Sequence, residues 1–65
     1  MKERSRQAVR GALVNYRIKK GTDTGQTDIT DMIADLLLYA GEKGLGAEAI
    51  LRMATTHYKE EKDRD

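Results

Sequence analysis

The chain has 65 residues, of which 38% are hydrophobic and 35% charged, and it contains no Cys, Phe or Trp. A chain of this length forms one domain at most, and without large aromatic residues its core is small. The absence of Cys excludes disulfides and thiolate zinc sites, and the single His cannot build a His-rich metal centre. Small domains without these supports often rely on a second subunit, so we expect a homodimer or an obligate complex.

No apolar stretch approaches the ~20 residues that span a bilayer. The longest, residues 33–40, is interrupted by Asp35. The charged residues 1–6 are not followed by an apolar segment, so a signal peptide is not expected. A Cys-free chain fits a reducing compartment. We therefore expect a cytoplasmic protein that makes no membrane contact.

The first helix is predicted from about Ser5 to Lys20, with Ser5 as its N-cap and Gly21 directly after its end. Apolar residues recur at the i, i+3, i+4, i+7 spacing of one helix face. They are Val9, Ala12, Leu13 and Tyr16.

The second helix is predicted to begin near Thr27 or Asp28, either of which could cap it, and to end near Glu42. Its apolar face comprises Ile29, Met32, Ile33, Leu36, Leu37 and Ala40. In a chain without Pro, glycines are expected to mark the breaks between helices. The candidates are Gly21, Gly25, Gly41, Gly44 and Gly46.

The third helix is predicted from Gly46 or Ala47 to about Glu61, with Ala47, Ile50, Leu51, Ala54 and Tyr58 on one face. The connection before it spans residues 43–46 at most, which favours an αα-hairpin. The predicted fold is all-α: three short helices, with a C-terminal antiparallel helical hairpin packed against a basic N-terminal helix. Residues 1–65 form one domain, and residues 1–4 and 62–65 are expected to be frayed.

Charge is distributed unevenly along the chain. Residues 1–20 carry seven Lys or Arg and one Glu, residues 21–49 carry six acidic residues and one Lys, and residues 50–65 carry four of each sign. On the first helix Arg6, Arg10 and Arg17 fall within roughly 40° of one another, and Lys2 and Lys20 extend this row. We refer to Arg6, Arg10, Arg17 and Lys20 as the basic stripe. It is a candidate surface for an acidic protein or for phosphates. The alternative is a solvated helix face that balances the acidic second helix.

Binding to nucleic acid through this first helix is an alternative function. Apart from Tyr16, the basic segment has no aromatic residue on which bases could stack. If the last two helices formed a helix–turn–helix, the recognition helix would begin with Ala47 and Glu48 and reach Arg52 as its first basic residue. Such a sequence is poorly suited to a phosphate-rich groove.

Leu38 is a second candidate partner-binding residue. Helical spacing places it opposite the apolar face of its helix, beside Asp31, Asp35 and Glu42. A leucine ringed by carboxylates could anchor a partner and fit the basic stripe of a second copy, or it could be an ordinary exposed side chain. Val14 and Ile18, on the outer side of the first helix, suggest a second apolar surface.

Catalysis is not expected. His57 is the only good general base by residue type, and at the edge of a helix face it is interpreted as a packing residue. The loop 21–28 lacks the Gly-Lys-Ser/Thr ending of a P-loop and the spaced acidic ligands of an EF-hand. The sequence therefore predicts no catalytic residue, no cofactor and no metal.

The segment from Thr30 to Tyr58 contains the string Asp35-Leu-Leu-Leu-Tyr-Ala40, a Gly-rich turn, and Ala54-Thr-Thr-His-Tyr58. It resembles small helical proteins of phages and other mobile elements with a D-L-L-x-Y-A helix and a C-terminal A-x-x-H-Y helix. The resemblance implies a mobile-element origin and supplies no activity. One implied role is a protein that binds and modulates a host protein, such as an inhibitor of a defence system. The other is a small regulator that contacts nucleic acid.

Overall fold

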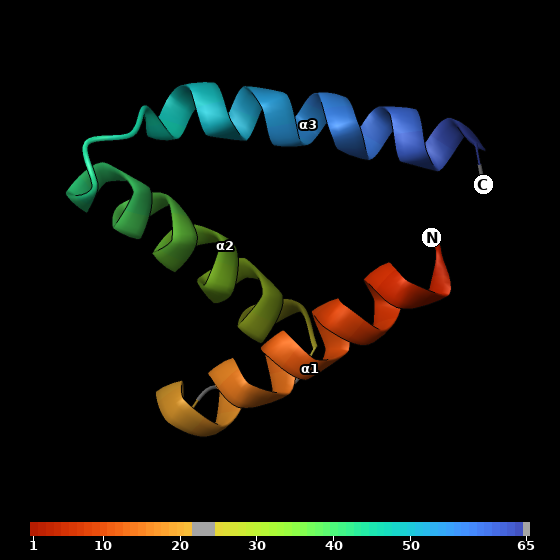
Figure 1. Ribbon diagram of the computed structural model, residues 1–65. Helices are drawn as coiled ribbons and strands as arrows, with labels where there is room; N and C mark the ends of the chain where they lie inside the picture. Colours follow the sequence, from red (N-terminus) through yellow and green to blue (C-terminus); the bar gives the residue numbers. More distant parts are fainter. Residues whose placement is uncertain (22–24, 65) are drawn as a thin grey trace. The chain divides into compact units, whose positions relative to one another are not determined.

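The computed structural model describes residues 1–21 and 25–64, and within these ranges it contains three α-helices and no strand (Figure 1). The helices are α1 (Glu3–Lys20), α2 (Gln26–Glu42) and α3 (Ala47–Arg64). The predicted all-α fold with three helices is therefore confirmed.

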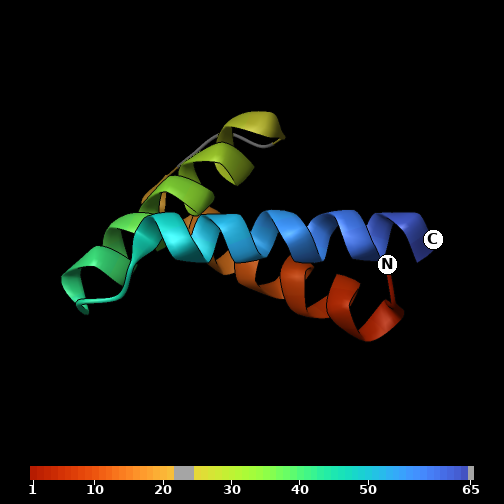
Figure 2. The ribbon, with the colours of Figure 1, turned by 90° about the horizontal axis from the view of Figure 1, so that it is seen from above.

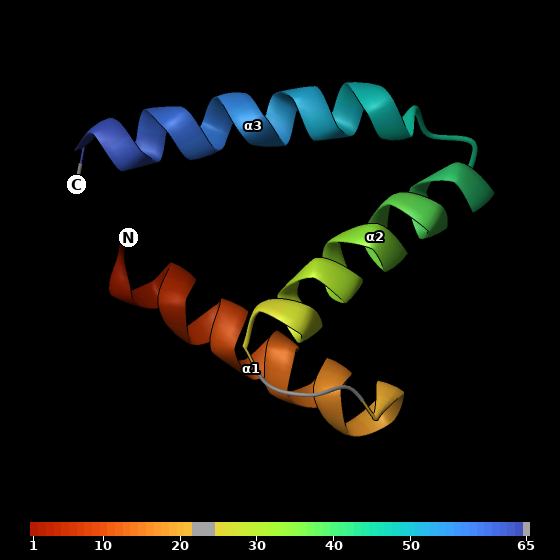
Figure 3. The ribbon, with the colours of Figure 1, turned by 180° about the vertical axis from the view of Figure 1, so that it is seen from behind.

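The chain divides into two compact units, and the division falls within α2. The first unit spans residues 2–34 and contains α1 and the first turns of α2, which lie beside α1 (Figure 3). The second unit comprises residue 1 and the chain from residue 35 onward, with the end of α2 and all of α3. Within this unit residues 43–46 connect α2 to α3. After this connection the chain reverses, and α3 leads away from the end of α2 (Figure 2). The predicted short connection between the last two helices is confirmed.

The start of α1 differs from the prediction. The helix begins at Glu3, and Lys2 occupies the N-cap position without a side-chain capping bond, so the predicted cap at Ser5 is wrong. Glu3 in the first turn explains the earlier start. Its carboxylate accepts a hydrogen bond from Arg6 Nη1 at 3.1 Å and another from Gln7 Nε2 at 3.4 Å, and negative charge is favourable at this helix end.

The end of α1 is as predicted. Gly21 has a left-handed backbone with φ of 75°, and its N–H donates to the carbonyl oxygen of Arg17 at 2.9 Å. This is the αL capping arrangement, in which the residue after the helix satisfies a carbonyl of the last turn. A side chain with a Cβ would adopt this conformation with strain, which explains the glycine.

The end of α2 is closed by a Schellman motif, formed around Gly44 with φ of 75°. The Leu45 N–H donates to the Ala40 carbonyl at 2.9 Å, and the Gly44 N–H donates to the Gly41 carbonyl at 3.1 Å. Gly41 was expected to be a break, but it lies inside the last turn of the helix, and Gly44 makes the turn. The Gly46 carbonyl then accepts the first hydrogen bond of α3, from the N–H of Ile50 at 3.0 Å.

The other boundaries shift by a few residues. α2 begins at Gln26, so Thr27 and Asp28 lie in its first turn and do not cap it. There the Asp28 carboxylate is still favoured by the helix dipole. α3 begins at Ala47 as predicted and continues to Arg64, so it includes residues 62–64, for which fraying was expected.

The predicted apolar faces do not form a core in the described residues. Ala40 is the only apolar residue there that is buried, and Met32 and Leu37 on the same helix are half-buried. Ile29, Ile33 and Leu36, which were predicted to face a core, are 49–57% exposed. α1 and α3 have no buried residue. The helices are therefore amphipathic, as predicted, but much of their apolar surface is accessible.

The Schellman turn yields a test with a matched control. We expect Gly44→Ala to destabilise the fold by about 1 kcal/mol, because alanine must adopt the left-handed conformation. Gly41→Ala, three residues earlier and inside α2 with open space around its Cα, should stabilise it by about 0.5–1 kcal/mol. Urea unfolding followed by circular dichroism measures both values. Equal effects of the two variants would contradict the assignment of Gly44 as the turn residue.

Candidate interaction surfaces

One ion pair joins α1 to the first turn of α2. Arg17 Nε donates a hydrogen bond to Asp28 Oδ2 at 2.9 Å, and Arg17 Nη2 lies 2.8 Å from the same oxygen. Both residues belong to the unit of residues 2–34. Arg17 lies in the last turn of α1, where its carbonyl also accepts the Gly21 N–H, so one residue closes the helix and links it to the next.

The two partners of this ion pair differ in exposure. The side chain of Asp28 is fully buried, whereas 31% of the Arg17 side chain is accessible. The second carboxylate oxygen, Oδ1, is buried and has no hydrogen-bond donor among the described residues. A buried carboxylate is strongly unfavourable without a cation beside it, so Asp28 depends on Arg17 more than Arg17 depends on Asp28.

The structure therefore distinguishes Arg17 from the rest of the basic stripe. Arg10 and Lys20 are exposed on α1, and Arg6 is exposed while paired with Glu3 at 3.1 Å. The sequence placed all four on one side of the helix, but the pairing of Arg17 with Asp28 depends on the position of α2 and was missed. The accessible part of the stripe is Arg6, Arg10 and Lys20.

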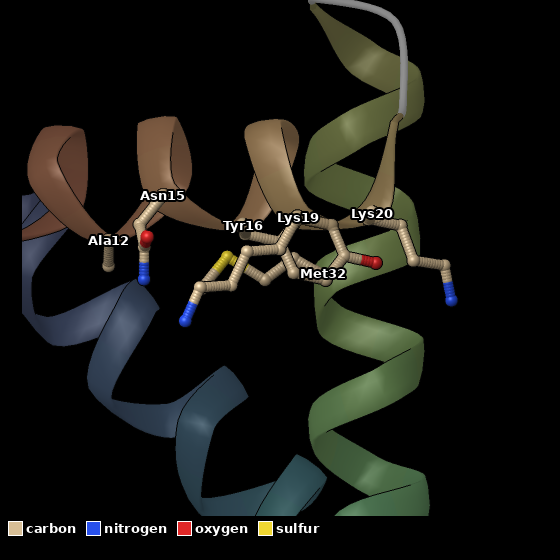
Figure 4. Close-up of a pocket in the computed structure, with 6 residues that line it drawn as sticks. All are labelled: Ala12, Asn15, Tyr16, Lys19, Lys20 and Met32. Carbon is tan, nitrogen blue, oxygen red and sulfur yellow. The ribbon is translucent and has the colours of Figure 1, made fainter.

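A shallow pocket of about 430 Å³ lies in the same unit, between α1 and α2 (Figure 4). Five of its lining residues come from α1 and one from α2: Ala12, Asn15, Tyr16, Lys19, Lys20 and Met32. Lys20 thus belongs both to the basic stripe and to the pocket rim. The sequence analysis did not single out Asn15 or Lys19, because the pocket exists only where Met32 of the second helix lies near α1.

Leu38 is 68% exposed on α2, and Glu42, one turn later, is also exposed. Asp31 and Asp35, the other two carboxylates of this strip, are half-buried, so the ring of acidic groups around Leu38 is only partly accessible. On α1, Val14 and Ile18 are 42% and 75% exposed, which agrees with an outward apolar surface.

His57 is exposed on α3. In the described ranges no three His, Cys, Asp or Glu side chains gather in a way that could hold a metal ion. None of the helices in the same ranges has the length and hydropathy needed to cross a bilayer.

Comparisons with known proteins give no relative. No protein family matches the chain, no curated protein is similar to it, and no solved structure resembles it. The resemblance to small phage proteins therefore stays a prediction.

The ion pair predicts an asymmetric response to mutation. Arg17→Ala should lower the free energy of unfolding by about 3–5 kcal/mol, because it leaves a buried carboxylate without a cation. Asp28→Ala should lower it by about 2 kcal/mol, because Arg17 can still reach water. The control Arg10→Ala, an exposed arginine of the same helix, should change it by less than about 0.5 kcal/mol. Chemical denaturation of the three variants measures these differences. Equal losses for Arg10→Ala and Arg17→Ala would contradict the structural role of Arg17.

Proposed function

We propose that this chain is a small, non-enzymatic, cytoplasmic interaction protein of the phage or mobile-element type that binds and modulates a host protein. The observation that carries the proposal is the exposure of apolar surface. Fourteen large apolar side chains are exposed among the described residues, while Ala40 alone is buried there. Exposed apolar surface is typical of sites that bind other proteins.

Exposed charged residues on the same helices would orient a bound partner protein. Arg6, Arg10 and Lys20 present accessible positive charge along α1. Leu38 with Glu42 presents an apolar side chain beside a negative charge on α2. An apolar anchor surrounded by charges is a common composition for a protein interface, in which the charges steer association and the anchor contributes most of the affinity.

Occlusion of a host protein is a mode of action that suits a chain of this size. A standard interface occupies about 800 Å² and about 20–30 residues on each partner, which a chain of 65 residues can provide. Inhibition of a defence system would be one form of such modulation. We also propose that the chain is a homodimer, because Ala40 is the one buried apolar residue among the described residues and small domains without disulfides or metals often rely on a second subunit.

A pull-down from bacterial lysate, with and without nuclease, tests the proposed host-protein partner. We expect one protein to remain bound after nuclease treatment, and Arg6→Glu/Arg10→Glu to reduce its capture at least tenfold, since the steering charges are reversed. Arg17 is left unchanged because of its ion pair with Asp28. The control Arg52→Glu/Lys59→Glu makes the same change of net charge on α3 and should retain binding.

Each other outcome of the pull-down has a definite meaning. Recovery of nucleic acid, with loss of the captured protein after nuclease treatment, would overturn the proposal in favour of a nucleic-acid-binding regulator. Equal loss with both double variants would show that net charge matters and the position of the charges does not. Leu38→Asp should also weaken capture if Leu38 is an anchor, with circular dichroism to verify that helicity is retained.

A further inference from the structure

α3 carries an apolar face that the rest of its own unit, residues 35–64, leaves largely exposed. This face comprises Ala47, Ile50, Leu51, Ala54 and Tyr58, which recur at the spacing of one side of a helix. Ala47 is half-buried, and Ile50, Leu51 and Tyr58 are 40–62% exposed. The face extends over three turns, and its opposite side carries Arg52, Thr56 and Lys59. An amphipathic helix of this kind is usually stabilised by packing its apolar side against another element.

We propose that a second copy of the chain covers this face, with the two α3 helices packed antiparallel about a two-fold axis near Ala54. The inference rests on the proposed homodimer and adds the surface and the orientation by which it forms. In a two-fold pair the same patch is used on both copies, so a residue a given distance before Ala54 faces one the same distance after it.

The apolar residues suit this register. Ala54 faces Ala54 of the second copy at the crossing point, where small side chains allow two helices to approach closely. Ile50, four residues before it, faces Tyr58 of the second copy, four residues after it, and the same contact occurs twice by symmetry. The largest side chains of the face therefore fill the space on both sides of the crossing.

Charge complementarity favours the antiparallel orientation. Glu48 and Lys62 lie on the same edge of the face, one near each end of α3. Lys62 Nζ lies 5.9 Å from the ring centroid of Tyr58, which places this ammonium group beside the apolar face. When two such helices pack antiparallel, like edges meet, so Glu48 of each copy and Lys62 of the other lie on the same edge, offset by about 3 Å along the axis, which a lysine side chain can span. The pair thus gains two contacts between opposite charges.

A parallel pair would bring like charges together. Glu61 lies two turns after Ala54 and therefore falls within the face, so in a parallel pair it would meet Glu61 of the second copy. In the antiparallel pair Glu61 instead approaches the N-terminus of the other α3, where a negative charge is favourable.

Two charge-reversal variants, measured separately and then mixed, test the proposed contacts between Glu48 and Lys62. Glu48→Lys makes the edge positive at both ends, and Lys62→Glu makes it negative at both ends. Each variant alone should dimerise about tenfold more weakly than the wild type, because the opposite charges are replaced by like charges. An equimolar mixture should recover the wild-type dimer fraction, since each contact in a mixed dimer again joins a lysine to a glutamate. Sedimentation velocity over a range of concentrations measures these fractions.

The same glutamate substitution at two alanines of α3 tests the apolar contact independently. Ala54→Glu places a charge at the crossing point and should make the chain monomeric, whereas Ala49→Glu, the same substitution on the far side of α3, should leave it dimeric. Circular dichroism should show the same helicity for both variants. Leu38→Asp, on α2, should also leave the dimer intact.

The results that would overturn the proposal are specific. A wild-type chain that is monomeric at every concentration would overturn both this inference and the proposed homodimer. A dimer that survives Ala54→Glu, or that Leu38→Asp disrupts while Ala54→Glu does not, would locate self-association on another surface and leave the proposed homodimer standing. A charge-variant mixture no more dimeric than its separate components would exclude the antiparallel Glu48–Lys62 contacts. Binding of a host protein is measured separately, so its failure is distinguishable from all three.

Discussion

The main constraint on this molecule is that its helices carry more apolar surface than packing within each of the two units buries. Ala40 is the one buried apolar residue in that part of the chain, and it lies in the last turns of α2. Hydrophobic burial is normally the largest favourable contribution to folding, and here little of it comes from tertiary packing. Local hydrogen bonds therefore define the helix ends, and the apolar faces are available to other molecules.

The Arg17–Asp28 ion pair shows how a chain with so little core can still fix the position of two helices. An ion pair depends on direction and on particular atoms, whereas apolar contacts tolerate many arrangements. Asp28 is fully buried, so a shift of the first turn of α2 that separated it from Arg17 would leave a buried carboxylate without its cation. The pair therefore specifies an arrangement more than it adds stability, a role attributed to buried polar groups in some small proteins.

The sequence predicted the three helices because helical periodicity and glycine positions are local signals, and Gly21 and Ala47 lie at the boundaries as expected. Prediction from the sequence failed where the environment of a side chain depended on a residue distant in the sequence. Arg17 was grouped with Arg6 and Arg10 because helical spacing cannot reveal that Asp28 lies beside only one of them. The apolar face of α2 was expected to be buried because periodicity shows which residues share a side and does not show what covers that side.

The proposed surfaces lie on different helices, and this separation has a consequence for binding. The accessible basic residues are on α1, Leu38 is on α2, and the face proposed for self-association is on α3. A dimer formed through α3 would present each of the other two surfaces twice. Two linked copies bind a two-site target with an effective concentration that a monomer lacks, so avidity can exceed the affinity of either site by about a hundredfold or more. Self-association would then strengthen a weak contact of the small basic surface without any new residue at that contact.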